Sequence, residues 1–108
     1  MVMALMVKAT AYVIESCEWN CDGFASMAMN RASKFCKKDP WIKLPMVRSD
    51  RDLDFFKQDG EILCKGCVTV SATVENIEAA NNVLNEFIVA AAHFGFEVGF
   101  DIIGKIIL

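Results

Sequence analysis

Apolar and polar residues alternate with a period of two in three stretches of the chain, and this spacing predicts β-strands. The stretches span residues 7–16, 62–73 and 96–103. In the first of them the apolar positions are Val7, Ala9, Ala11 and Val13. A fourth and shorter strand is expected over residues 41–47, where Pro45 restricts it to a sheet edge or a bulge.

Two longer segments place their apolar residues at the helical spacing of about 100° per residue, so that one face of each is apolar. The first takes Asp22 as its N-cap and runs to about Lys38, where an Asp-Pro pair ends it. Its predicted inner face consists of Phe24, Ala25, Ala28, Met29, Ala32, Phe35 and Cys36. The second spans about residues 74–94, and Gly95 supplies a left-handed stop. Its predicted inner face consists of Ile77, Ala80, Val83, Leu84, Phe87, Ala91 and Phe94.

A third and short helix is expected over residues 50–58. The tetrapeptide Ser49–Asp52 is similar to a capping box, with Asp in place of Glu. Leu53 and Phe56 would share a helical face, and Gly60 would end the helix.

The order of these elements is strand, helix, strand, short helix, strand, helix, strand. A doubly wound parallel sheet is buried on both faces, so its strands read as continuous apolar runs. Here three of the four strands carry Thr, Ser, Asp or Lys at alternate positions, which indicates helices on one side only. We therefore predict an α+β two-layer sandwich of the ferredoxin-like βαββαβ kind with an antiparallel four-stranded sheet. A three-layer α/β open sheet is the alternative.

Length and composition indicate the number of domains and the cellular compartment. With 108 residues, 55% of them hydrophobic, and a net charge of −3, the chain fits one compact domain over residues 1–108 and is too apolar to be disordered. No apolar run approaches the roughly 20 residues that cross a bilayer. The apolar start lacks the features of a signal peptide, and Met1, Met3 and Met6 are all suitable initiators. We expect a cytoplasmic protein whose five cysteines are reduced.

Four of the cysteines form a candidate zinc site, made of Cys17, Cys21, Cys64 and Cys67. The first pair follows one predicted strand and the second pair begins its antiparallel neighbour, so the thiols would meet at one end of the sheet. One objection is that Cys64 and Cys67 are three apart in a strand and point to opposite faces, unless a bulge at Gly66 realigns them.

Basic residues gather in one stretch that comprises Arg31, Lys34, Lys37, Lys38, Lys43 and Arg48. Such a patch is typical of a surface that binds nucleic acid. It is equally typical of a solvated helix face whose cations complement the C-terminal end of the helix dipole, and the acidic net charge favours that interpretation.

No catalytic arrangement is evident. His93, the only histidine, falls on the polar side of its helix near the C-terminal end, where an exposed cation is favourable. Asp50, Asp52 and Asp54 are expected to be solvated, and neither a phosphate-binding glycine loop nor a nucleophile elbow is present. The sequence therefore gives no support for an enzyme and implies no cofactor, zinc being the alternative.

The uncovered face of the predicted sheet is the remaining candidate site. Its partner-binding residues would be Tyr12, Ile14, Thr69, Ser71, Ile103 and Ile107. An apolar patch of this kind favours association with another protein or with a second copy of the chain. We thus expect a small non-enzymatic interaction module that binds a protein partner and forms a homodimer. Its size and lack of motifs also fit an inhibitor of the type that phages and mobile elements use against host defence complexes.

Overall fold

The computed structural model describes residues 3–36 and 47–107, and the side chains of residues 5–36, 47–97 and 99. Four strands and two helices form an α+β arrangement. The elements are β1 (Met3–Ser16), α1 (Glu18–Ala32), the 3-10 helix η1 (Ser33–Phe35), β2 (Val47–Gln58), β3 (Glu61–Val74), α2 (Ile77–Phe94) and β4 (Glu97–Ile107).

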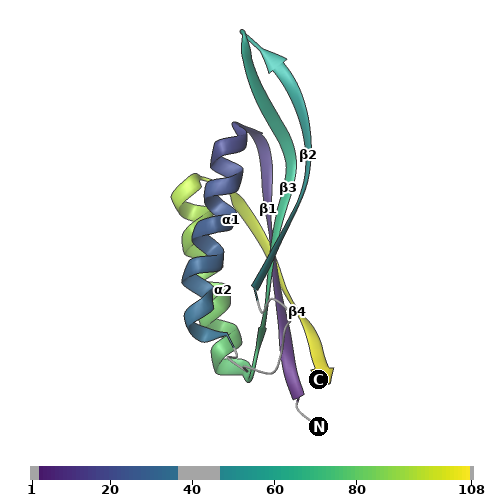
Figure 1. The fold of residues 1–108 in the computed structure, drawn as a ribbon, viewed down its shortest axis with the longest axis vertical. Helices are drawn as coiled ribbons and strands as arrows, with labels where there is room; N and C mark the ends of the chain where they lie inside the picture. Colours follow the sequence, from purple (N-terminus) through teal and green to yellow (C-terminus); the bar gives the residue numbers. More distant parts are fainter. Residues whose placement is uncertain (1–2, 37–46, 108) are drawn as a thin grey trace.

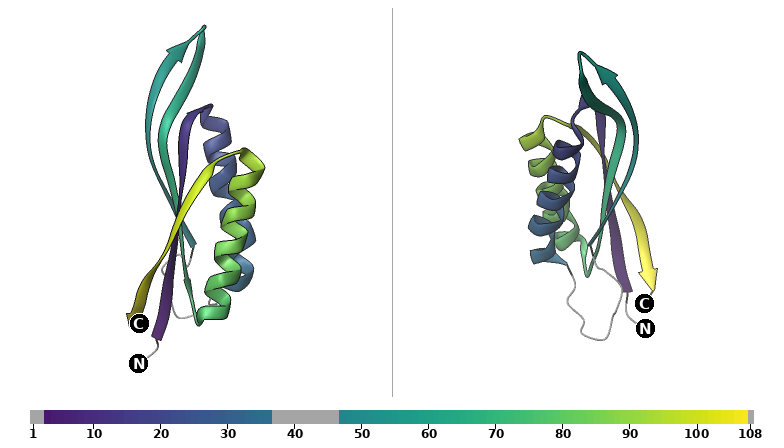
Figure 2. Two further views of the ribbon diagram at one scale, coloured as in Figure 1. Left: turned by 180° about the vertical axis from the view of Figure 1, so that it is seen from behind. Right: turned by 45° about the horizontal axis from the view of Figure 1, so that its top comes forward.

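The strands form one sheet in the order β2-β3-β1-β4, and every neighbouring pair is antiparallel. Helices α1 and α2 lie side by side on the same face of this sheet (Figure 1; Figure 2). The predicted α+β class and two-layer arrangement are therefore confirmed. The three-layer alternative is wrong, because none of the strand pairs is parallel and both described helices cover the same face.

The core lies between the helices and the alternate strand residues that face them. On β1 and β3 these residues are Val7, Ala9, Ala11, Val13, Val68, Val70, Ala72 and Val74, all buried. The helices contribute Phe24 and Phe87, which are fully buried, together with small alanines that bring the helix backbones close to the sheet. Complete burial of each phenylalanine stabilises the fold by about 2–3 kcal/mol.

Helix α2 is capped at both ends by residues adjacent to it in the sequence. The side chain of Asn76 accepts a hydrogen bond from the Ala79 amide at 2.9 Å, and Gly95 adopts a left-handed φ of 72° as expected. The helix begins three residues later than predicted, because Val74 still belongs to the buried side of β3. Ile77 is consequently exposed and does not join the inner face.

Helix α1 begins before the predicted N-cap. Its N-cap is Cys17 and its first turn holds Glu18, so Asp22 lies inside the helix. Arg51 of β2 stabilises this earlier start, since its guanidinium contacts Glu18 at 2.8 Å and Asp22 at 2.9 Å. Two predictions fall partly outside the described residues: the end of this helix near Lys38, and the strand over residues 41–47, of which only Val47 is described, as the first residue of β2.

The predicted short helix over residues 50–58 is wrong, because this segment is the larger part of β2. Asp59 and Gly60 have φ values of 53° and 83°, which join β2 and β3 through a tight hairpin turn. Gln58 pairs with Glu61 directly across this turn, and the pairing continues without a shift to Val47 and Ala72. The ladder of backbone hydrogen bonds to β3 outweighs the weak helical signal.

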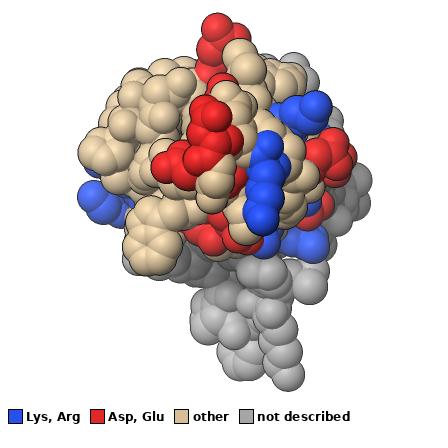
Figure 3. Space-filling view, turned by 90° about the horizontal axis from the view of Figure 1, so that it is seen from above, with Lys and Arg blue, Asp and Glu red and all other residues tan. Residues whose placement is uncertain are grey.

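The end of this hairpin extends beyond the helices as a two-stranded arm, defined here as residues 55–64 (Figure 1). Strand β1 follows β3 only as far as the pair Ser16 and Cys64, so the outer part of the arm has two strands. Along the molecule's longest dimension of 55 Å, the arm forms one end. Seen from that end, acidic and basic side chains lie next to one another (Figure 3).

Candidate functional site

The sheet face opposite the helices is the first candidate surface. Its central residues come from β1 and β3, where Thr10 and Thr69 face each other with their hydroxyl oxygens 3.4 Å apart. Of the predicted partner-binding residues, Tyr12 is 53% exposed, and Thr69 and Ser71 are half-buried without a helix above them. The side chains of Ile103 and Ile107 lie outside the described residues.

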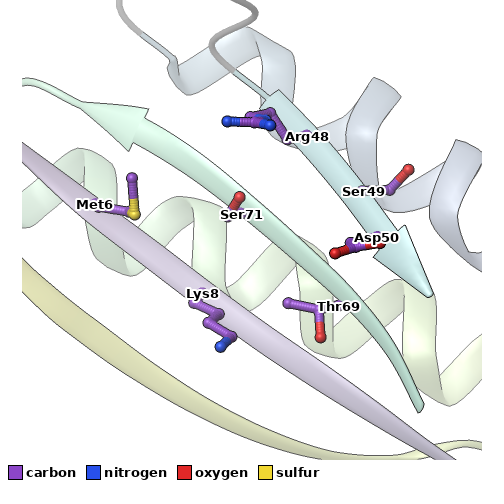
Figure 4. A pocket seen from close by; sticks show the side chains of 7 residues that line it. All are labelled: Met6, Lys8, Arg48, Ser49, Asp50, Thr69 and Ser71. Carbon is purple, nitrogen blue, oxygen red and sulfur yellow. The ribbon is translucent and has the colours of Figure 1, made fainter. Parts of the chain in front are cut away.

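A polar hollow of about 480 Å³ occupies this face between β1 and β2 (Figure 4). Lys8 of β1 contributes to the lining, and Arg48 and Asp50 extend over the hollow from β2. The complete lining is Met6, Lys8, Arg48, Ser49, Asp50, Thr69 and Ser71. Two cations, one carboxylate and the hydroxyls of Thr69 and Ser71 can hydrogen-bond to a polar partner, whereas the Ser49 side chain points away from the hollow. The lining lacks the Cys or His that would supply a nucleophile or a neutral base.

A second hollow, the Ile14 groove, lies where β1 extends past the start of β4. The last pair between these strands joins Tyr12 and Glu97, so within the described residues the end of β1 has no partner on that side. The groove has a volume of about 350 Å³. Its lining is Tyr12, Ile14, Glu15, Ser16, Asn20, Phe94, Gly95, Phe96 and Glu97.

Both apolar and polar side chains line the Ile14 groove. The side chain of Ile14 is 81% exposed. Two aromatic rings of the same lining, Phe94 at the end of α2 and Phe96 two residues later, stack with their centres 6.2 Å apart. The β-bulge between Val13 and Ser16, where β1 shifts its register against β3, directs this part of the strand away from the regular ladder. An uncovered isoleucine therefore lies beside an unpaired strand edge.

The candidate zinc ligands are not brought together. Cys21 and Cys64 are in contact, with their sulfur atoms 3.6 Å apart, and the Cys64 thiol donates to the carbonyl of Ser16 at 3.2 Å. Cys67 instead pairs with Asp52 and lies on the uncovered face, so the two β3 cysteines do point to opposite faces. The register shift is in β1 and not at Gly66. No described group of three or more His, Cys, Asp or Glu side chains is arranged to hold a metal ion.

The environment of the buried thiols disfavours nucleophilic attack, which uses the thiolate. Burial raises the pKa of Cys21 from 9.0 to about 12, and its contact with Cys64 adds to the shift. Burial likewise raises the pKa of Cys36 to about 11. At neutral pH these thiols are protonated and behave as small apolar side chains.

The predicted basic patch does not form one surface in the described residues. Arg31 joins the two helices through an ion pair with Glu86 at 2.6 Å, whereas Arg48 points over the opposite face of the sheet. Lys34 is exposed on η1. Lys37, Lys38 and Lys43 lie outside the described residues.

The remaining candidates are exposed, as the sequence led us to expect. His93 is in the last turn of α2, and its ring contacts the edge of the Phe94 ring at 5.0 Å. Asp50, Asp52 and Asp54 are solvated, but on a strand and not on a helix cap. Sequence reasoning missed the exposed apolar side chains of the arm, because it did not use the hairpin signal of the Asp-Gly pair.

Comparison with protein-family models finds no match, and no curated protein or solved structure matches the chain either. Among the described helices, none has the length and apolar content that a membrane crossing requires.

Proposed function

We propose that this chain is a small non-enzymatic module that acts by binding another protein through the Ile14 groove. The observation that carries the proposal is the exposure of Ile14 and Tyr12, at 81% and 53%, beside a strand end that has no described partner on its β4 side. Large apolar side chains grouped at an open strand edge are typical of protein-binding surfaces.

The groove fits a partner that adds an extended segment to β1 and places an apolar side chain against Ile14. Burial of an isoleucine contributes about 2 kcal/mol, and each new backbone hydrogen bond contributes about 1 kcal/mol. Phe94 and Phe96 would form the floor under that side chain. A module of this kind acts by occupying its partner's surface, which agrees with the role of an inhibitor of a protein complex, of phage or mobile-element type, in the cytoplasm.

We further propose that the fold is ferredoxin-like. The order of strands and helices along the chain and the strand order β2-β3-β1-β4 support this assignment. Of the alternative functions, a zinc-stabilised domain would need Cys67 to cross the sheet, and a nucleic-acid-binding domain would have to use Arg48 and Lys8 without Arg31.

The proposal is tested by site-specific photo-crosslinking in the native host. A benzophenone amino acid replaces Ile14 in one variant and Ile77 in a control variant. Ile77 is 56% exposed and is the first residue of α2. This helix has 18 residues, so Ile77 lies about 27 Å along it from the end that lines the groove. We expect one discrete protein adduct from position 14 and none of that size from position 77. Equal labelling from both positions, or no adduct from position 14, would refute the Ile14 groove as the binding surface.

A further inference from the structure

The outer edge of β2 is a second open surface, and nothing in the Ile14 groove accounts for it. This strand has 12 residues and pairs only with β3 in the described part of the chain. Its arm segment exposes Phe55 to 51%, and Ile62 on the neighbouring β3 to 63%. A two-stranded ribbon is marginally stable in water, so an apolar arm of this kind gains from a further strand.

The backbone groups that face outward on β2 belong to its odd-numbered residues. Gln58 and Glu61 flank the two-residue turn, so they form a hydrogen-bonded pair, and such pairs alternate along an antiparallel ladder. The even-numbered residues of β2 therefore bond to β3. Residues 51, 53, 55 and 57 direct their amide and carbonyl groups away from the sheet, where a second strand can bond to them.

We propose that two copies of this chain associate by antiparallel pairing of their β2 edges, with Phe55 on the two-fold axis. This register sets the Phe55 side chains of the two copies next to each other on the helix-side face of the joined sheet. Leu53 of one copy then lies opposite Lys57 of the other, and the turn residue Asp59 lies near Arg51. On the other face Asp52 meets Gln58, and Asp54 meets Phe56.

Several registers of β2–β2 pairing would keep both helix layers on the same face of the joined sheet. The charges on β2 favour the register centred on Phe55. Each register centred on a residue from 51 to 54 places like charges directly opposite each other. These pairs are Asp with Asp, Arg51 with Arg51, or Arg51 with Lys57. Such pairs destabilise an antiparallel ladder. Pairing centred on Phe56 avoids like charges but leaves Asp59 opposite Leu53. Phe56 is also less open than Phe55, because the Lys65 ammonium lies 6.0 Å from its ring centre.

The shape of the molecule allows this pairing. The arm extends beyond the helices (Figure 1), so the two β2 edges overlap over residues 51–59 while the two helix layers lie at opposite ends. The charged side chains of β2 then have a second role, since they disfavour the registers centred on residues 51 to 54 and limit edge-to-edge growth. Because each copy contributes its only β2 edge, the association closes at two copies.

Sedimentation equilibrium of the purified chain and of Phe55→Asp tests the proposal, with Ile14→Asp as the matched control and circular dichroism as the check on folding. We expect a monomer–dimer equilibrium whose dissociation constant rises at least about tenfold in Phe55→Asp, the equivalent of 1.4 kcal/mol, and is unchanged in Ile14→Asp. Asp59→Asn, which retains a side chain suited to the left-handed turn, should weaken the dimer affinity about threefold. A wild-type chain that stays monomeric at its highest attainable concentration would overturn the proposal.

Cysteine cross-linking tests the register without depending on stability. In a background with Cys17 and Cys67 replaced by serine, Phe55→Cys places two thiols at a hydrogen-bonded pair whose Cα atoms are about 5.5 Å apart, within disulfide reach. Asp59→Cys is the control, since its two copies would lie about 27 Å apart. Mild oxidation should cross-link the first variant and not the second, and the reverse pattern or equal yields would contradict the register. A wild-type chain that stays monomeric but still gives the protein adduct from position 14 would refute only this inference, not the protein-binding function.

Discussion

At the scale of single residues, Cys21 shows how position decides what a reactive side chain does. Its sulfur contacts that of Cys64 at 3.6 Å, in a site where burial raises its pKa to about 12. Cys67, only three residues from Cys64, lies on the opposite face beside Asp52 and Thr69. Residue spacing alone suggested a cluster of four thiols, whereas the strand faces separate them.

The raised pKa of Cys21 predicts a dependence of stability on pH. From pH 9.0 upward the unfolded thiol loses its proton while the folded one keeps it, so the free energy of unfolding falls as pH rises from 9.0 towards about 12. Urea denaturation of the wild type and of Cys21→Ala over this range measures the effect. The variant should be less stable at neutral pH but lose less stability with rising pH. Parallel curves would show that the thiol does not titrate differently in the two states.

The partner-binding residues were partly predictable from the sequence. Tyr12 lies between the buried residues Ala11 and Val13 of its strand, and this alternation was sufficient to place Tyr12 on the uncovered face. The exposure of Ile14 depends in addition on the bulge in β1 and on where β4 begins, both of which are long-range features of pairing. The arm residue Phe55 could have been found from the Asp-Gly turn four positions later.

At the scale of elements, β1, β3 and α2 were predictable because each has one buried and one solvated side. Their alternation or helical period follows directly from that asymmetry. The segment over residues 50–58 has no such pattern, since it lies at the sheet edge and most of its side chains are exposed. Leu53 and Phe56 are three apart by coincidence, and their strand pairing is fixed by the turn and by β3.

Gly66 is the residue on which the β2–β3 pairing depends most. Its φ is 141°, and a β-carbon there would collide with the carbonyl oxygen of Asp52 on the neighbouring strand. We expect Gly66→Asn to destabilise the fold by about 2 kcal/mol, measured by urea denaturation. Gly60→Asn is the matched control, because its φ of 83° is also positive but nothing lies within 4 Å of its β-carbon position. Equal losses in both variants would mean that only the backbone angle matters.

At the scale of the whole molecule, the helices cover one face of the sheet, and the part of the chain that the structure describes has three open regions with different chemistry. The polar hollow lies over β1 to β2, the Ile14 groove lies at the end of β1, and the edge of the arm lies on β2. The groove and the arm edge belong to opposite sides of the sheet order, so one chain can bind a partner and a second copy at the same time. Because the two surfaces are separate, one substitution can disrupt binding through either of them without changing the other.

The most direct measurement is the affinity of the protein captured from position 14 for the purified wild type, Ile14→Asp and Ile77→Asp, determined by calorimetry. Ile14→Asp removes about 2 kcal/mol of apolar burial. It also buries a carboxylate, so we expect binding at least about tenfold weaker than wild type. Ile77→Asp introduces the same charge at a comparably exposed isoleucine outside the groove and should leave the affinity unchanged. Wild-type affinity in Ile14→Asp would contradict the account.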